Sequence, residues 1–380
     1  MGKEKSKSGP LARRPDNSAF KQQRLPAWSP MLTASAVLPF FYLLALICML
    51  LGVWLLLTVQ NTQEMKVRDP LDSRDTDESF CLKNSSWVSA LDFQVDYTEA
   101  GSCNLCFEMR KNVSNAGQRC TCMIVFSIEK AFKGDVFIYY GLRNFHQNLR
   151  RYMDSRDDGQ MLGRKSNLKS PSSYCKPFDV DEKGVPIAPC GAVANSMFND
   201  SFILTYYTIN GPTVVPLLRK GLTWYTDKNV KYRNPKMDNL TLPEVFEGTT
   251  RPPYWQKPVY QLDPFDPNNN GFINDDLLVW MREAAFPNFK KLYGFLYRAN
   301  KPFTKGLPAG NYSVTISYNF PVQYFKGRKE VVLTTVSWFG GQNHFLPIAY
   351  LVTSGLILLT AVVLTVVWWK FGKDGKNMAD

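Results

Sequence analysis

The sequence has very little of what enzymes use for chemistry. It contains two histidines, His146 and His344, and neither has an evident nucleophile as a partner. It has no G-x-S-x-G elbow, no H-E-x-x-H pair and no G-x-x-x-x-G-K-[ST] phosphate loop. The adjacent carboxylates Asp157 and Asp158 follow Arg156, which favours an ion pair and a turn over an acid and base facing a shared substrate. We therefore expect no enzymatic activity and no cofactor.

The chain also lacks a long run of basic residues. The net charge is +12, but 33 acidic residues are mixed among 45 basic ones. A nucleic-acid-binding chain is expected to concentrate its positive charge, so we expect no nucleic-acid partner. With 45% hydrophobic and 14% aromatic residues, the chain can bury a core.

Two segments have no charge at all, Val37–Val59 and Phe345–Trp369. Each exceeds the ~20 residues that a helix needs to cross the hydrocarbon layer. The first is longer than the ~7 to 15 apolar residues of a signal peptide, and no small-residue cleavage site follows it. The sequence therefore predicts transmembrane helices at 31–59 and 345–369.

Basic residues flank the outer end of each predicted span. Seven lie in the first 30 residues, and Lys370, Lys373 and Lys376 follow the second span. Positive flanks stay in the cytosol. We therefore expect cytosolic tails at 1–30 and 370–380, and a domain at 60–344 in the secretory lumen or outside the cell.

The glycosylation triplets agree with this topology, because all of them lie between the spans, where the glycosylation machinery reaches. The Asn-x-Ser/Thr acceptors are Asn84, Asn112, Asn199, Asn239 and Asn311. We expect most of them to carry glycans.

All but one of the eight cysteines also lie between the spans, and Cys48 lies within the first span as an inert buried thiol. The C-x-x-C and C-x-C spacings of four of them would suit a four-thiolate zinc site in a cytosolic protein. In an oxidising lumen disulfides form and persist, so the expected compartment favours bridges over zinc.

An antiparallel hairpin would place the two cysteine pairs opposite one another. Under that arrangement the expected bridges are Cys103–Cys122, Cys106–Cys120 and Cys175–Cys190. Cys81 is left over, and either stays free or tethers another chain.

The region between the spans has the pattern of a β-rich α+β domain. The clearest strand is 312–318, where Tyr312, Val314, Ile316 and Tyr318 alternate with polar residues. Further strands are expected at Met123–Ile128, Val136–Tyr140 and Val331–Trp338, with a turn at Lys326-Gly327 before the last.

One helix is expected after Asn274 or Asp275, either of which can cap it, and Pro287 should end or kink it before a second stretch to Tyr297. Just upstream, Asp266-x-Asn268-x-Asn270-Gly271 fits the first half of a calcium loop, but Leu277 stands where the closing Glu should be. A polar turn that caps the helix is the better interpretation, so we expect no metal.

Several strings occur in the same order as in a known membrane family. They are Arg13-Arg14-Pro15-Asp16-Asn17, Phe20-Lys21-Gln22-Gln23-Arg24-Leu25-Pro26-Ala27-Trp28, Tyr139-Tyr140-Gly141-Leu142, Pro186-Ile187-Ala188-Pro189-Cys190-Gly191, Asn195-Ser196-Met197-Phe198-Asn199-Asp200, Asn270-Gly271-Phe272-Ile273-Asn274 and Leu307-Pro308-Ala309-Gly310. From about Arg13 to the second span, the chain resembles the cell-cycle-control and ligand-effect-modulator family. Members of that family are accessory (beta) subunits of class IV P-type ATPases, the phospholipid flippases.

The resemblance implies a non-catalytic subunit that forms a heterodimer with a flippase, escorts it out of the endoplasmic reticulum and supports its movement of aminophospholipids. It implies residence in the endoplasmic reticulum, in Golgi or secretory vesicles and in the plasma membrane. The family's cysteine pairing agrees with the bridges above, whereas Cys81 and the 60–100 segment depart from its pattern. The alternative is a cell-surface receptor or adhesion glycoprotein, for which the C-terminal tail offers no signalling segment.

Two regions are candidates for contact with a partner and with membrane lipids. Beside the first span, Phe20, Arg24 and Trp28 suit lipid headgroups or the cytosolic face of a partner, although they could simply anchor the chain. In the second span, small residues lie four apart at Ala349/Thr353 and Ala361/Thr365, which permits close approach of another helix.

Overall fold

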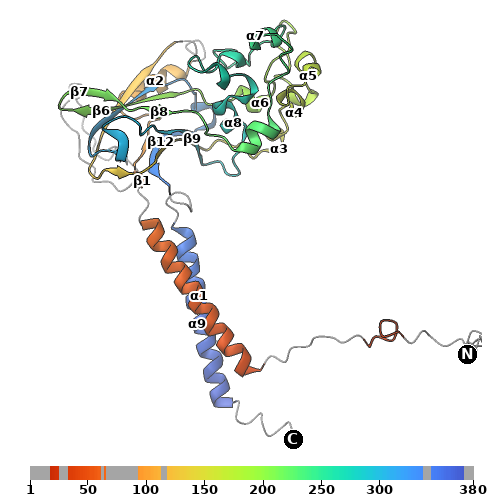
Figure 1. Ribbon diagram of the computed structural model, residues 1–380, viewed down its shortest axis with the longest axis vertical. Helices are drawn as coiled ribbons and strands as arrows, with labels where there is room; N and C mark the ends of the chain where they lie inside the picture. Colours follow the sequence, from red (N-terminus) through yellow and green to blue (C-terminus); the bar gives the residue numbers. More distant parts are fainter. Residues whose placement is uncertain are drawn as a thin grey trace, which may run out of the picture. The chain divides into compact units, whose positions relative to one another are not determined.

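The computed structural model describes residues 18–24, 33–60, 64–65, 93–112, 118–336 and 344–371. The chain divides into two compact units (Figure 1). Residues 1–56 and 344–380 form the first unit, and residues 57–343 form the second, called here the central domain.

Two long apolar helices carry the predicted spans. Helix α1 is Ala34–Gln60 and helix α9 is Phe345–Phe371, each 27 residues long. Both exceed the length needed to cross a bilayer, and both are candidate membrane spans. Helix α1 begins three residues after the start of the predicted 31–59 segment, and Thr33 just before it is not helical, while residues 31 and 32 lie outside the described residues. Pro347 lies in the first turn of α9, where its missing amide donor does no harm.

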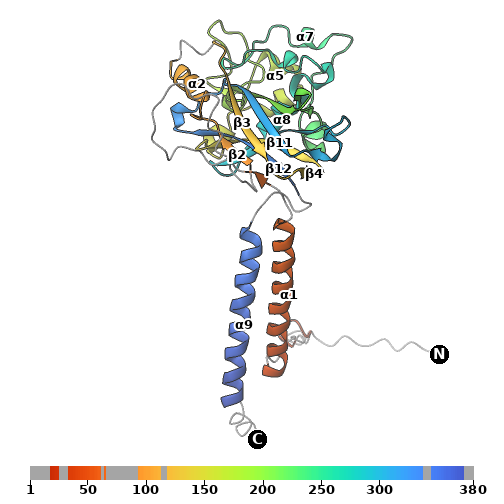
Figure 2. The same ribbon diagram turned by 90° about the vertical axis from the view of Figure 1, so that its left-hand side faces the viewer.

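Two antiparallel sheets build the central domain (Figure 2). The larger has the order β1-β12-β5-β9-β8, with β1 Glu64–Met65, β12 Arg328–Thr335, β5 Val136–Arg143, β9 Phe289–Leu296 and β8 Leu217–Leu218. The smaller has the order β3-β11-β6-β7, with β3 Thr121–Ile128, β11 Gly310–Ser317, β6 Ser201–Thr208 and β7 Gly211–Val214. Strand β2, Phe93–Asp96, lies beside β12, and β4, Phe132–Lys133, pairs with β10, Gly306–Leu307.

One apolar core joins the inner faces of the two sheets. The predicted alternation in β11 holds, because Tyr312, Val314 and Ile316 are buried in it. Aromatic rings fill much of the space, as in the contact of Phe202 with Tyr293 at a centroid separation of 4.8 Å. The expected β-rich domain is therefore present.

Short helices form a second layer around a smaller core. They are α3 Arg150–Met153, α4 Asp158–Met161, α5 Lys165–Lys169, α6 Ala192–Asn195, α7 Leu242–Val245 and α8 Asp275–Met281, with single turns at Ser173–Cys175, Asp227–Lys231, Val259–Gln261, Pro267–Asn269 and Gly271–Ile273. Two further single turns, Phe303–Lys305 and Gln323–Phe325, pack against the core between the sheets. The indole of Trp280 on α8 donates to the carbonyl of Val193 on α6 at 2.7 Å. This bond holds α6 against α8, the longest helix of the second layer.

The predicted cap of α8 is correct, but its predicted continuation is wrong. The Asn274 side chain accepts from the amide of Leu277 at 3.0 Å. The helix ends at Met281, before Pro287, and the ammonium of Lys291 donates hydrogen bonds to the carbonyls of Val279, Trp280 and Arg282 at its end. The stretch to Tyr297 is the strand β9, held by pairing with β5.

The four clustered cysteines form two nested disulfides, as predicted, but they do not lie on a hairpin. Cys103 and Cys106 lie on helix α2, Cys103–Arg110, and face Cys120 and Cys122 at the start of β3. Residues three apart on a helix share a face, and so do residues two apart on a strand, so each pair presents both sulfurs to one side. The structure places the sulfurs of Cys103–Cys122 at 2.07 Å, of Cys106–Cys120 at 1.92 Å and of Cys175–Cys190 at 2.00 Å.

The remaining strand predictions hold with shifted ends. The predicted turn lies at Lys326, which has a left-handed φ of 51°. Strand β12 then begins at Arg328, three residues before the predicted start, and ends at Thr335. Residues Ser337 and Trp338 of the prediction lie outside the described residues.

Candidate interaction surfaces

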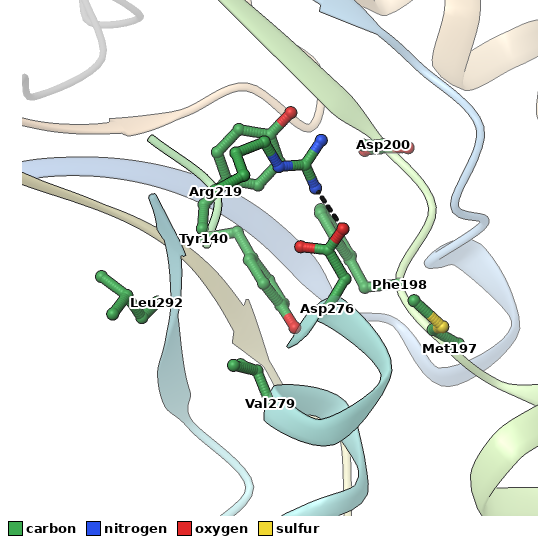
Figure 3. Close-up of a pocket in the computed structure, with 9 residues that line it drawn as sticks. Tyr140, Met197, Phe198, Asp200, Arg219, Asp276, Val279 and Leu292 are labelled. Atoms are coloured by element: carbon green, nitrogen blue, oxygen red, sulfur yellow. Dashed lines mark ion pairs between the residues drawn. The ribbon is translucent and has the colours of Figure 1, made fainter. Parts of the chain in front are cut away.

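A small hollow in the central domain has too little room for a substrate. It lies between β5, β9 and α8 and has a volume of about 20 Å³, which is room for about one water molecule (Figure 3). Arg219 pairs with Asp276 at 2.8 Å and stacks 4.2 Å from the ring centre of Tyr293. Burial raises the pKa of Asp276, and Arg219 opposes that rise. The arrangement is a closed ion pair on aromatic packing.

A larger hollow of about 540 Å³ is an open groove beside the polar turn that resembles a calcium loop. The oxygens of this turn are already used. The Asp263 carboxylate accepts from the amides of Phe265 and Asp266, and Asp266 pairs with Lys220 at 2.6 Å. No group of three or more His, Cys, Asp or Glu suited to a metal occurs among the described residues. These bonds agree with the polar-turn interpretation.

The predicted structural role of the adjacent carboxylates also holds. Asp157 accepts from the amide of Gln160 at 3.0 Å and so caps α4. Asp158 pairs with Arg156 at 3.1 Å, and Arg156 also reaches Glu283 at 2.6 Å.

An ion pair that the sequence did not predict lies in the core between the sheets. The side chains of Lys329 and Asp200 are fully buried, and their charged atoms are 2.6 Å apart. Asp200 also accepts from the hydroxyl of Tyr97 at 2.8 Å, and Lys329 donates to the carbonyl of Phe320 at 2.8 Å. Burial lowers the pKa of Lys329 to about 8, against the opposing effect of Asp200. The pair connects β12 of the larger sheet to the residue that precedes β6 of the smaller one.

The sequence contains no signal for this pair. Lys329 lies between Arg328 and Glu330, which looks like a solvated strand end, and Asp200 lies inside a glycosylation triplet. The residues are 129 positions apart. Only the folded arrangement brings them together.

The two long helices contact each other along a narrow stripe. Most of the buried residues are seven positions apart. They are Leu38, Ala45, Gly52, Leu55 and Val59 on α1 and Pro347, Ser354 and Ala361 on α9. Seven is the repeat of a left-handed helix pair. The hydroxyl of Ser354 donates to the carbonyl of Ala45 at 2.8 Å, and Tyr42 bonds to Thr365 at 2.9 Å.

One of the two small-residue pairs predicted for helix contact lies on this stripe. Ala361 is fully buried and Thr365 reaches α1. The other pair does not lie on this stripe, because Thr353 is exposed and Ala349 is only half-buried, and its contact with a partner helix stays a prediction. Thr353 precedes Ser354 by one residue, which turns its side chain ~100° away from the stripe.

Most other side chains of the pair are apolar and exposed, including Leu43 and Leu50 on α1 and Val352 and Leu359 on α9. Such surfaces are stable only against lipid or against further apolar helices. The pair therefore has outward faces available to both.

The predicted N-terminal contact residues are only partly described. Residues 18–24 form a tight turn in which the amide of Arg24 donates to the carbonyl of Ala19 at 2.7 Å. Phe20 is 75% exposed on it, and Arg24 is also exposed. Trp28 lies outside the described residues. An exposed aromatic ring next to a cation is a suitable contact element.

Four of the five glycosylation acceptors are described residues, and these four, Asn112, Asn199, Asn239 and Asn311, are all exposed. Asn84 lies outside the described residues, as does the unassigned Cys81. Among the described cysteines, Cys48 is the free one.

The fold and these surfaces define a class: a two-span membrane protein with a disulfide-braced, β-rich domain between its spans. Residues 82–374 match the model of the LEM3 (ligand-effect modulator 3) family / CDC50 family, and the chain belongs to that family.

Relatives align over nearly the full length. Cell cycle control protein 50A of Bos taurus is 47% identical over 97% of this chain and 92% of its own. Cell cycle control protein 50B of Homo sapiens is 43% identical over 95% of each chain. ALA-interacting subunit 3 of Arabidopsis thaliana is 33% identical over 94% of this chain and 87% of its own.

Proposed function

We propose that this chain is a non-catalytic accessory subunit of a class IV P-type ATPase. In this role it supports the folding of the flippase, its exit from the endoplasmic reticulum and its translocation of aminophospholipid. Family membership over nearly the whole chain carries the proposal. The name of the Arabidopsis relative, an interacting subunit, agrees with a partner-binding role.

The chain's own residues are consistent with such a role. It has no Asp-Lys-Thr-Gly phosphorylation motif, and Asp227-Lys228-Asn229 continues differently. The helix pair leaves outward apolar faces against which spans of a partner could pack. A subunit that binds only the folded pump stabilises it by mass action, so a pump without it would stay in quality control.

The proposed topology has both tails in the cytosol, at 1–30 and 370–380, and 60–344 in the lumen or outside the cell. It carries glycans at the five triplets and is held by the three disulfides. The complex would pass from the endoplasmic reticulum through Golgi and secretory vesicles to the plasma membrane. Phe20, Arg24 and Trp28 would contact the cytosolic side of the pump or the adjacent headgroups.

The test is co-purification from cells that express this chain with each of several class IV P-type ATPases. We expect at least one pump to co-purify with this chain. We also expect this chain to acquire mature glycans when that pump is present. Combined Phe20→Ala and Arg24→Ala substitution should weaken that capture. Lys7→Ala is the matched control, since it removes one tail charge outside the contact segment. If every pump is absent from the purified material, the proposal is wrong and a receptor or adhesion role becomes the better one.

A further inference from the structure

The outer face of the four-stranded sheet has no charged residue. Alternation along each strand sends one set of side chains to the core and the other set outward. The outward set is Thr121, Met123, Val125 and Ser127 on β3, Asn311, Ser313, Thr315 and Ser317 on β11, Ser201, Ile203, Thr205 and Tyr207 on β6, and Pro212 and Val214 on β7. An antiparallel sheet with one face in water normally has polar, often charged residues there.

The apolar members of this face lie on both sides of the hydroxyl residues of β11. Val125 and Thr205 flank Ser313, and Met123 and Ile203 flank Thr315 in the next row. The exposed fractions are 60% for Val125, 50% for Met123 and 52% for Ile203. Exposed apolar side chains gathered on one uncharged face often mark a surface that another group covers.

A glycosylation acceptor lies on the face itself. Asn311 is exposed on β11, between Ser127 on β3 and Tyr207 on β6 (the strands β3 and β11 run side by side in Figure 2). A second acceptor, Asn199, lies just before β6 at the opposite end, about 27 Å along the strand direction at ~3.4 Å per residue. The face is therefore bracketed by two possible glycans.

We propose that the glycan on Asn311 lies over this face and covers it, with the Asn199 glycan at the far end, so that the face is not a contact surface for a partner chain. The inference rests on the luminal placement proposed above. Sugar rings present C–H faces that pack on side chains such as Ile203, and hydroxyls that bond to Ser and Thr. Neither contact needs charge, which matches a face of apolar and hydroxyl side chains. A glycan also supplies the solubility that the protein surface lacks.

The order of events follows from Ser313, the hydroxyl residue of the Asn311 triplet. Ser313 is 1% exposed and bonds to the hydroxyl of Tyr207 at 3.1 Å. Because the folded sheet closes around the triplet, the glycan must be added before β11 pairs with its neighbours. It is then in place when the face forms.

The test measures access to the face in the full-length chain at the cell surface. Val125→Cys is introduced and its reaction with a membrane-impermeant, polymer-linked maleimide is timed. Leu149→Cys is the control, because Leu149 is similarly exposed, at 58%, but lies just before α3. We expect Asn311→Gln to raise the labelling rate at Val125→Cys severalfold and to leave Leu149→Cys unchanged. Enzymatic deglycosylation of the folded Val125→Cys chain should have the same effect, without relying on a variant that could fold poorly.

Three results would overturn the inference. Asn311→Gln could leave gel mobility unchanged, which shows that Asn311 carries no glycan. Labelling of Val125→Cys could be equally fast with and without the glycan. Ile203→Glu could abolish capture of a pump that the parent chain captures, which makes the face a partner contact. Failure of pump capture by the parent chain itself would instead count against the proposed function and would leave the labelling result intact.

Discussion

Replacing Lys329 by Met should strongly destabilise the central domain. The substitution keeps a long apolar side chain but removes the charge that neutralises Asp200. That carboxylate would remain fully buried, accepting from the Tyr97 hydroxyl and from the amides of Asn319 and Phe320, each amide at 2.6 Å. Breaking a buried pair by removing one partner costs about 3 to 5 kcal/mol.

The measurement is thermal unfolding of the full-length protein in detergent. For a domain of this size, about 2 °C of Tm corresponds to 1 kcal/mol, so a loss of about 6 to 10 °C is expected. Asp200→Asn is the partner variant, and it keeps the Asn199 triplet intact because Asn is permitted at its middle position.

The double variant should lose much less than the sum of the two single losses, because no uncompensated charge remains. A Lys329→Met loss below ~1 kcal/mol, or full additivity with Asp200→Asn, would refute the reasoning that this pair is a coupled, desolvated unit.

Three further predictions concern the pH dependence of the Lys329 pair, one disulfide and the contact between α1 and α9. The pKa of Lys329 is about 8 folded against 10.5 unfolded, so the unfolded chain binds more protons between these values. The free energy of unfolding of wild type relative to Lys329→Met should therefore rise from pH 8 to 10.5, and a fall measured by denaturant titration would contradict the assignment. Combined Cys106→Ser and Cys120→Ser should cost about 2 to 5 kcal/mol and reduce glycan maturation, whereas Cys48→Ser, at the free thiol, should do neither. Ala361→Leu should separate α1 from α9 and lower cross-linking between them, while Val362→Leu on the exposed side should not.

The parts of the fold that the sequence predicted are those set by local pattern. The alternation of Tyr312, Val314 and Ile316 is itself the mark of a half-buried strand. Asn274 caps α8 through a bond to a residue three positions away. Each depends on neighbours in the chain.

The parts that it did not predict depend on distant residues. The lysines of β9 suggest a solvent-exposed segment. In the structure the ammonium of Lys291 instead donates to a carbonyl at the end of α8, and pairing with β5 fixes the segment as a strand. Cys103 and Cys106 lie on a helix rather than on a hairpin strand. Their spacing did not decide between the two, because residues one helical turn apart and residues two apart on a strand both present their sulfurs to one side. On α9, neighbouring residues point ~100° apart around the helix axis, so Ser354 contacts α1 and Thr353 does not.

The most direct test of the accessory-subunit role is aminophospholipid uptake in cells that lack their own members of this family. Inward movement of a labelled aminophospholipid is measured with the pump alone, this chain alone, both together, and both with an inactive pump. We predict uptake only when this chain accompanies an active pump, with the pump retained in the endoplasmic reticulum when expressed alone. Equal uptake with and without this chain, across the class IV pumps that reach the surface, would contradict the account.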